Sequence, residues 1–167
     1  MLTSIPEILK ETNELVFEKC NLVISNINKE IESKDYFAYK FELNTLNIVF
    51  RIAKITPKKI GQFVTLWKRN IGEQIQPYNA LDTIDLFVIN TKSDTSFGQF
   101  VFPKSILIQQ KVLTTNLIEG KRAIRVYPPW EKTINKQAQE TQKWQLNYFL
   151  EIPINLEKAR LLYMIEN

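Results

Sequence analysis

Two adjacent prolines, Pro128 and Pro129, limit how this chain can fold more than any other feature of its sequence. Proline has no backbone N–H, and it also disfavours the helical conformation in the residue before it. A strand over residues 121–127 must therefore end at about Tyr127, and a new element must begin beyond the prolines. We expect a strand, a rigid corner that presents Trp130, and then a helix.

The elements on either side of this corner each carry positive charge on one face. Alternate residues of a strand share a face, which groups Lys121, Ala123, Arg125 and Tyr127. The helical spacing of apolar residues predicts a helix from Glu131 to Phe149. Its core-facing arc comprises Ile134, Ala138, Thr141, Gln145, Tyr148 and Phe149, with Trp144 at the edge. Lys132, Lys136 and Lys143 form a basic stripe on the other side.

The sequence predicts that residues 1–167 form one α+β domain with a mixed central β-sheet flanked by helices. The expected elements are a helical segment over 1–33, strands over 36–43 and 46–55, a helix over 56–72, strands over 84–90 and 97–108, and a C-terminal helix over 155–165. In the helix over 56–72, Thr56 and Pro57 form the start. Lys58 and Lys59 then lie beside free amide groups of the first turn, which predicts an anion site.

Composition excludes several classes of chemistry. The chain has no histidine, which removes Ser-His and Cys-His catalysis and most transition-metal sites. Its one cysteine, Cys20, cannot form an intramolecular disulfide, and we expect it to be buried in a protein of the reducing cytoplasm. No apolar run is long enough to span a membrane, and no glycine-rich phosphate loop occurs. We expect no cofactor and no metal.

The distribution of charge predicts a polyanionic partner. Residues 51–143 contain fifteen Lys or Arg and only seven Asp or Glu, whereas both flanking segments are net acidic. Such a basic block favours nucleic acid first and anionic lipid second.

One constellation resembles the plan of the PD-(D/E)xK nucleases, in which two carboxylates hold Mg²⁺ and a lysine helps to activate water. Asp85 opens a predicted central strand, and Glu42 lies on an earlier strand. The following strand offers Gln99-Phe100-Val101 where the nuclease pattern requires acid-x-Lys, and Lys104 comes three positions too late. We therefore expect no catalytic residues. Asp85 is instead predicted to pair with a buried arginine, Arg51 or Arg125.

Four segments in order carry a resemblance to a known family: 53–69, 84–89, 98–104 and 121–130, followed by Thr141-Gln142-Lys143-Trp144-Gln145. Over residues 36–151 the chain resembles the MepB-like family, bacterial cytosolic proteins named for a product encoded with a multidrug efflux pump and its repressor. The family has no established enzymatic activity. The resemblance implies a restriction-endonuclease-like architecture and a nucleic-acid-binding role.

The predicted function is therefore non-catalytic binding of DNA or RNA through phosphates, with little sequence specificity. The predicted phosphate contacts are Lys54, Lys58, Lys59, Lys68, Arg69, Lys104, Arg122, Arg125, Lys132, Lys136 and Lys143. Tyr127 and Trp130 are either base-stacking platforms or core residues, whereas Trp67 and Trp144 are predicted to pack in the core. Two alternatives remain: a protein-interaction or small-molecule-binding module, and a residual Mg²⁺-dependent nuclease that brings Asp85, Glu42 and Lys104 together.

Overall fold

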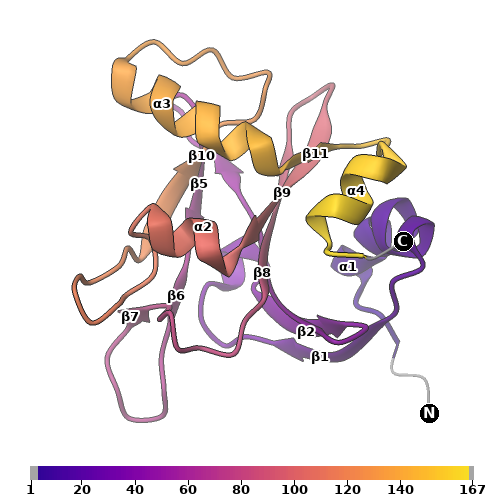
Figure 1. Cartoon of the computed structure of the whole chain (residues 1–167), viewed down its shortest axis with the longest axis horizontal. Coiled ribbons are helices and arrows are strands. Elements are labelled where there is room, and N and C mark those ends of the chain that lie inside the picture. Colours follow the sequence, from indigo (N-terminus) through magenta and orange to yellow (C-terminus); the bar gives the residue numbers. More distant parts are fainter. Residues whose placement is uncertain (1–3, 166–167) are drawn as a thin grey trace.

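The computed structural model describes residues 4–165, and a six-stranded mixed sheet forms its centre (Figure 1). The strands in spatial order are β1 (Ile24–Lys29), β2 (Tyr39–Leu43), β3 (Leu46–Ile52), β8 (Leu86–Lys92), β9 (Phe97–Pro103) and β11 (Phe149–Glu151). β3 and β8 are parallel, and the other neighbours are antiparallel. The predicted α+β domain with a mixed central sheet is confirmed.

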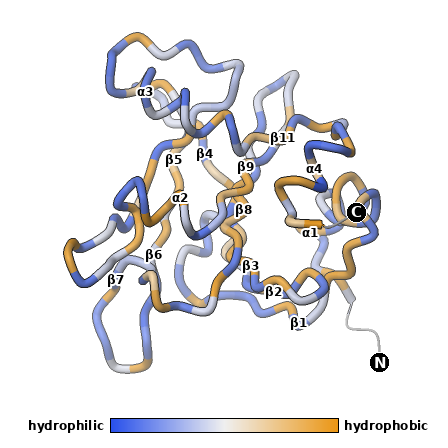
Figure 2. Tube along the Cα trace, in the orientation of Figure 1, coloured by the Kyte–Doolittle hydropathy of each residue, from blue (hydrophilic) through white to orange (hydrophobic). Residues whose placement is uncertain are grey.

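The two faces of this sheet bury separate apolar cores. In β2, Tyr39, Phe41 and Leu43 face one core together with the N-terminal helical turns and α4 (Leu156–Leu162). Phe87 and Phe102 face the other core, which α2 (Lys104–Gln109) and α3 (Lys136–Gln145) cover. Figure 2 shows the most apolar stretches along the central strands, between these helical layers. β8 is buried on both faces, as expected for a central strand.

The predicted helix over 56–72 is wrong. The segment forms a turn, then β5 (Gln62–Thr65) and β6 (Trp67–Lys68). β5 lies between β4 (Lys54–Ile55) and β10 (Ala123–Val126) in a three-stranded sheet, while β6 pairs with β7 (Gln76–Pro77). Aromatic and β-branched residues in 62–67 favour strand, and pairing with β10 outweighs the helical spacing of a short apolar pattern. Lys58 and Lys59 therefore lie in a turn and not at a helix N-terminus.

The predicted helical segment over 1–33 is correct only in its first part, and residues 1–3 lie outside the described chain. Helix α1 (Glu7–Thr12) continues through short turns at Asn13–Phe17 and Glu18–Cys20. Asn21, at φ 57°, ends these turns, since asparagine tolerates the left-handed conformation that closes a helix. β1 follows as a largely polar edge strand, so it lacks the apolar alternation that identifies a strand in a sequence.

Two helix boundaries also differ from the prediction. The strand expected over 97–108 ends at Pro103, and α2 begins at the next residue. α3 begins at Lys136 and not at Glu131, because the Asn135 side chain caps it by accepting from Ala138 N at 2.8 Å. Ile134 consequently lies outside the helix and is 80% exposed. No helix in residues 4–165 is long and apolar enough to cross a membrane.

The two strands joined at Asn44, the strand that ends before Pro128, the buried Cys20 and a C-terminal helix are confirmed. The strand expected over 46–55 is interrupted at Ala53, because β3 ends at Ile52 and Lys54–Ile55 pairs with β5 in the other sheet. Trp67, expected in the core, is half-buried and belongs to neither apolar core.

Gly61 provides a test of the turn that replaces the predicted helix. Gly61 has φ +86°, and a Cβ added there would lie 2.6 Å from Tyr127 Cε1. Gly72 has a similar φ of +79° but no atom within 4 Å of an added Cβ. We expect Gly72→Ala to lower the free energy of unfolding by about 1–2 kcal/mol through backbone strain alone, and Gly61→Ala to lower it by more. Urea denaturation of both variants measures the difference. Equal losses would show that Tyr127 does not cover the turn.

Candidate functional site

Two adjoining hollows lie where β10, the turn over residues 56–61 and α3 meet. The first, which we call the cationic hollow, has a volume of about 410 Å³ and is lined by Lys58, Lys59, Ile60, Arg125, Tyr127, Ile134, Asn135 and Ala138. The second, the amide hollow, has a volume of about 330 Å³. It is lined by Gln110, Val112, Lys121, Ala123, Ile124, Arg125, Tyr127, Asn135, Gln137, Ala138, Thr141, Trp144 and Gln145. Four residues line both hollows, so the two form one continuous surface.

Arg125 lies at the centre of this surface and organises the turn beside it. Its Nη1 donates to the carbonyl oxygens of Ile60 at 3.3 Å and Gly61 at 3.2 Å, and its Nη2 donates to Thr56 Oγ1 at 2.8 Å. The guanidinium also lies 5.8 Å from the ring centroid of Phe63. These contacts hold the turn against β10, which places Lys58 and Lys59 at the rim of the cationic hollow.

α3 completes the hollows by hydrogen bonding to the free edge of β10. The buried Gln145 accepts from Tyr127 N at 2.8 Å and donates to the carbonyl oxygen of Arg125 at 2.9 Å. Gln142 donates to the carbonyl oxygens of Pro128 at 3.0 Å and Glu131 at 2.9 Å. Two glutamine side chains thus take the place of a neighbouring strand, and they fix the distance between α3 and β10.

The charge of this surface is positive throughout. Lys58, Lys59, Lys121 and Arg125 line it, and none of its lining residues is Asp or Glu. None of these four residues forms an ion pair with a described carboxylate. Three other hollows on the described surface each contain carboxylates, for example Glu42 and Asp82 in one of them. The pair of hollows is therefore suited to an anion.

The sequence analysis did not predict Lys121 as a site residue, although alternate residues of a strand share a face and Lys121 therefore lies on the same face as Arg125. The structure brings together Lys58, Lys59, Arg125 and Tyr127 from that list, and adds Lys121. The sequence could not show which lysines join this face, because that depends on the turn over residues 56–61 lying beside β10.

Four of the predicted phosphate contacts are already engaged elsewhere. Lys68 pairs with Asp82 at 2.5 Å, Arg69 with Glu32 at 3.2 Å, and Arg122 with Glu119 at 2.8 Å. Lys104 Nζ donates to the carbonyl oxygen of Asp82 at 2.6 Å. Lys54, on β4, lies 5.2 Å from the ring centroid of Tyr36. These side chains do not line the cationic or the amide hollow.

The predicted lysine stripe does not form, because α3 is shorter than expected. Lys132 lies in the loop before α3, and only Lys136 and Lys143 belong to the helix. At about 100° per residue, both project about 80–160° around α3 from Gln137, Thr141 and Trp144, which face the amide hollow. The stripe residues and the hollows therefore lie on different faces.

The aromatic side chains near the site differ in whether they pack against the core, line the hollows, or do both. Trp130 packs edge-on against Phe149, with ring centroids 5.8 Å apart, at the border of the core. Trp144 packs against Phe102 at 5.4 Å and also lines the amide hollow. Tyr127 is half-buried and lines both hollows.

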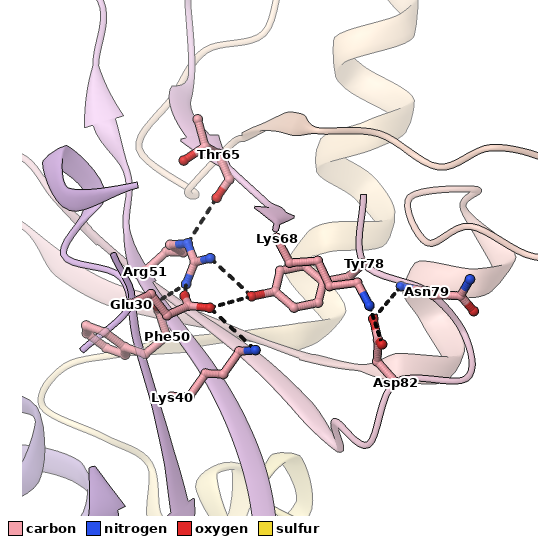
Figure 3. Close-up of polar contacts among 9 residues, drawn as sticks. All are labelled: Glu30, Lys40, Phe50, Arg51, Thr65, Lys68, Tyr78, Asn79 and Asp82. Carbon is pink, nitrogen blue, oxygen red and sulfur yellow. Dashed lines mark hydrogen bonds and ion pairs between the residues drawn. The ribbon is translucent and has the colours of Figure 1, made fainter. Parts of the chain in front are cut away.

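Arg51 has a different partner from the one the sequence predicted. It is 1% exposed and forms an ion pair with Glu30, without hydrogen-bond geometry (Figure 3). The Tyr78 hydroxyl donates to Glu30 Oε1 at 2.8 Å and accepts from Arg51 Nη2 at 3.3 Å. Burial raises the pKa of the Tyr78 phenol well above its ordinary value, so Tyr78 remains a neutral donor here.

Asp85 pairs with neither predicted arginine. Its Oδ2 accepts from Asn47 N at 2.7 Å, and that bond joins the start of β8 to β3. The Asp85 carboxylate thus has a structural partner in the backbone.

The β8–β9 hairpin separates Asp85 from Gln99, the position at which the nuclease pattern requires an acid, because Gln99 lies opposite Asn90. Lys104, a residue of the nuclease alternative, does lie beside Asp85: its N donates to the carbonyl oxygen of Asp85, but its Nζ donates to the carbonyl oxygen of Asp82. Asp85 and Asn90 are five residues apart, about 17 Å along a strand. Within residues 4–165, no three His, Cys, Asp or Glu side chains lie close enough together to hold a metal ion.

Gln99 belongs to a buried chain of neutral side chains. Gln99 Nε2 donates to Asn90 Oδ1 at 2.9 Å, and Asn90 Nδ2 donates to Thr12 Oγ1 at 2.7 Å. The Tyr163 hydroxyl donates to Gln99 Oε1, and burial raises the pKa of Tyr163 well above its ordinary value. All four residues are buried between the sheet and the helices α1 and α4.

Fold and hollows together define a class of protein, an α+β domain with a mixed sheet and a concave cationic surface free of carboxylates. The MepB-like family model matches residues 30–151. A crystal structure of MepB is 33% identical, with a TM-score of 0.76 over 89% of this chain and 98% of that chain. The chain belongs to the MepB-like family, which confirms the resemblance.

A second solved structure has a lower similarity. The bacterial homing endonuclease I-Ssp6803I is 14% identical, with a TM-score of 0.47 over 93% of each chain. At that similarity, the restriction-endonuclease-like architecture stays a prediction. Comparison with curated proteins found no match.

The ion pair in Figure 3 yields a stability prediction. Glu30→Ala leaves Arg51 buried without its carboxylate, and we expect the free energy of unfolding to fall by about 3–5 kcal/mol. Glu32→Ala is the matched control: its ion pair with Arg69 is partly exposed, with side chains 33% and 46% accessible. The control should lose about 1 kcal/mol or less. Urea denaturation of both variants tests this, and equal losses would contradict it.

Proposed function

We propose that this protein is a non-catalytic nucleic-acid-binding protein that holds phosphate groups of DNA or RNA in the cationic hollow. One observation carries the proposal: four cations line the two hollows, with no carboxylate among the lining residues. Lysine and arginine contacts to phosphate bind the backbone irrespective of sequence. The proposed binding is therefore strongly salt-dependent and only weakly sequence-specific.

Arg125 and the two lysines have different parts in this proposal. The guanidinium is held by neutral oxygens, so it keeps its full charge and supports the turn. Lys58 and Lys59 are exposed, and their flexible ammonium groups can follow a backbone of varying geometry. The proposal places Arg125 as a fixed contact at the centre and the lysines as adaptable contacts at the rim.

The proposal contains no catalytic step. The positions that an acid-x-Lys motif would occupy are Gln99 and Val101, both buried. The side-chain hydrogen-bond partners of Gln99 are the neutral Asn90 and Tyr163. We also propose that the protein acts in the cytoplasm, where the thiol of buried Cys20 stays reduced.

A charge-reversal pair tests the proposed surface. Fluorescence anisotropy of labelled single- and double-stranded DNA and RNA is measured against salt concentration for Lys58→Glu/Lys59→Glu. If each lysine neutralises one phosphate, the slope of log K against log salt falls by about 1.4–1.8. Affinity at low salt should fall with it.

The matched control is Lys132→Glu/Lys143→Glu, which makes the same change in net charge at two exposed lysines that do not line the hollows. This control should keep the wild-type salt slope. Equal loss in both variants would assign the effect to net charge, and a larger loss in the control would favour the lysine stripe. Absence of binding to any oligonucleotide at low salt would refute the proposal and favour an acidic protein partner. Mg²⁺-dependent shortening of the oligonucleotides would favour the nuclease alternative.

A further inference from the structure

The two adjoining hollows differ in chemistry in a way that matches the two halves of a nucleotide. The cationic hollow contains Lys58, Lys59 and Arg125, which suit a phosphate. The amide hollow instead contains the side-chain amides of Gln110 and Gln137 and the aromatic ring of Trp144. Tyr127 lines both. A phosphate alone would leave the aromatic and amide half of this surface unused.

The amides in this hollow are of two kinds. Gln145 is 1% exposed, and its side chain is fully engaged with the backbone of β10. Gln110 and Gln137 have no side-chain hydrogen bond to any residue in the described part of the chain. Gln110 is half-buried and Gln137 is exposed, so both can donate and accept toward a ligand. Side-chain amides of this kind hydrogen-bond to the edges of nucleobases.

We propose that the two hollows bind one nucleotide unit of a strand whose base is unpaired, with its base in the amide hollow and its phosphate in the cationic hollow. This inference rests on the proposed function and names its substrate class. The hollows, of about 330 and 410 Å³, fall at the lower end of the range of small-ligand sites, which is about 300–1,000 Å³. Hollows of this size accommodate one base and one phosphate.

Geometry explains why the base must be unpaired. A base in a duplex is stacked on both faces and hydrogen-bonded along its pairing edge, so it cannot enter a pocket in the protein. In a single strand, a loop or a strand end, both the faces and the edge are available. An aromatic side chain then stacks on the face, and amides bind the edge. The preferred ligand is single-stranded DNA or RNA, or an unpaired end.

An abasic oligonucleotide separates this inference from the proposed function. Two single strands of equal length, one normal and one with abasic sites throughout, carry the same phosphates and differ only in their bases. We expect anisotropy to show at least about fivefold weaker binding of the abasic strand, because stacking and edge contacts are lost. Both strands should retain the salt dependence that the lysines produce. Equal affinity for the two strands would overturn the inference and leave the proposed function intact, whereas no binding of either strand would refute both.

A variant of the amide hollow provides the second measurement. Gln110→Ala/Gln137→Ala removes the two unengaged amides and should weaken binding of the normal strand by about fivefold, with no change for the abasic strand. Gln74→Ala is the control, since Gln74 is an exposed glutamine of the loop between β6 and β7 that lines neither hollow. Equal weakening for both strands, or no weakening for either, would contradict base binding at this position.

Discussion

The candidate site depends on how the free edge of β10 is satisfied. β10 has only one neighbouring strand, β5, so its other edge presents backbone groups that need hydrogen-bond partners. Gln145 supplies both a donor and an acceptor to this edge, while Gln142 binds the carbonyl oxygens of the corner that follows. A second neighbouring strand would have covered the edge completely. A helix that reaches it with long side chains instead leaves space between the backbone and the helix, and the amide hollow is that space.

The buried Arg51 and the half-buried Arg125 differ in whether their charge is neutralised by a carboxylate. Arg51 is buried with a carboxylate and a tyrosine hydroxyl, because an uncompensated buried charge would cost several kcal/mol. Arg125 is half-buried and is held by a hydroxyl and two carbonyl oxygens, which orient the guanidinium without neutralising it. The first arrangement stabilises the fold. The second leaves a positive potential in a concave surface, where low-dielectric walls strengthen attraction for an anion.

The sequence predicted elements where one local signal dominated, and failed where tertiary pairing decided the outcome. Pro128 ended a strand correctly, since no tertiary contact can restore its missing N–H. The segment around Phe63 and Val64 carried a helical spacing that β10 overrode by pairing with it. The anion site at Lys58 and Lys59 was predicted from the free amide groups of a helix first turn. That helix does not form, so this reason for the site was also wrong. Those residues nevertheless line the cationic hollow, because Arg125 holds the turn that carries them.

The sequence also could not show which individual charged residues form ion pairs. Composition identified the basic block, but the ion partners of Lys68, Arg69 and Arg122 come from other parts of the chain or from the far side of a turn. No local pattern distinguishes a paired lysine from an unpaired one. Lys121 could have been found from the sequence, since it shares the period-two face of Arg125, whereas Gln110 could not, because α2 brings it to the site.

The buried chain of Thr12, Asn90, Gln99 and Tyr163 explains why the open surface lies on the other side of the sheet. Four neutral side chains satisfy one another there, so that face can close under α1 and α4 without burying a charge. A carboxylate at Gln99 would lose the amide donor that Asn90 accepts and would need a cation or a proton in a dry core. With that face closed, the concave surface that remains beside α3 is the one with cations and unengaged amides.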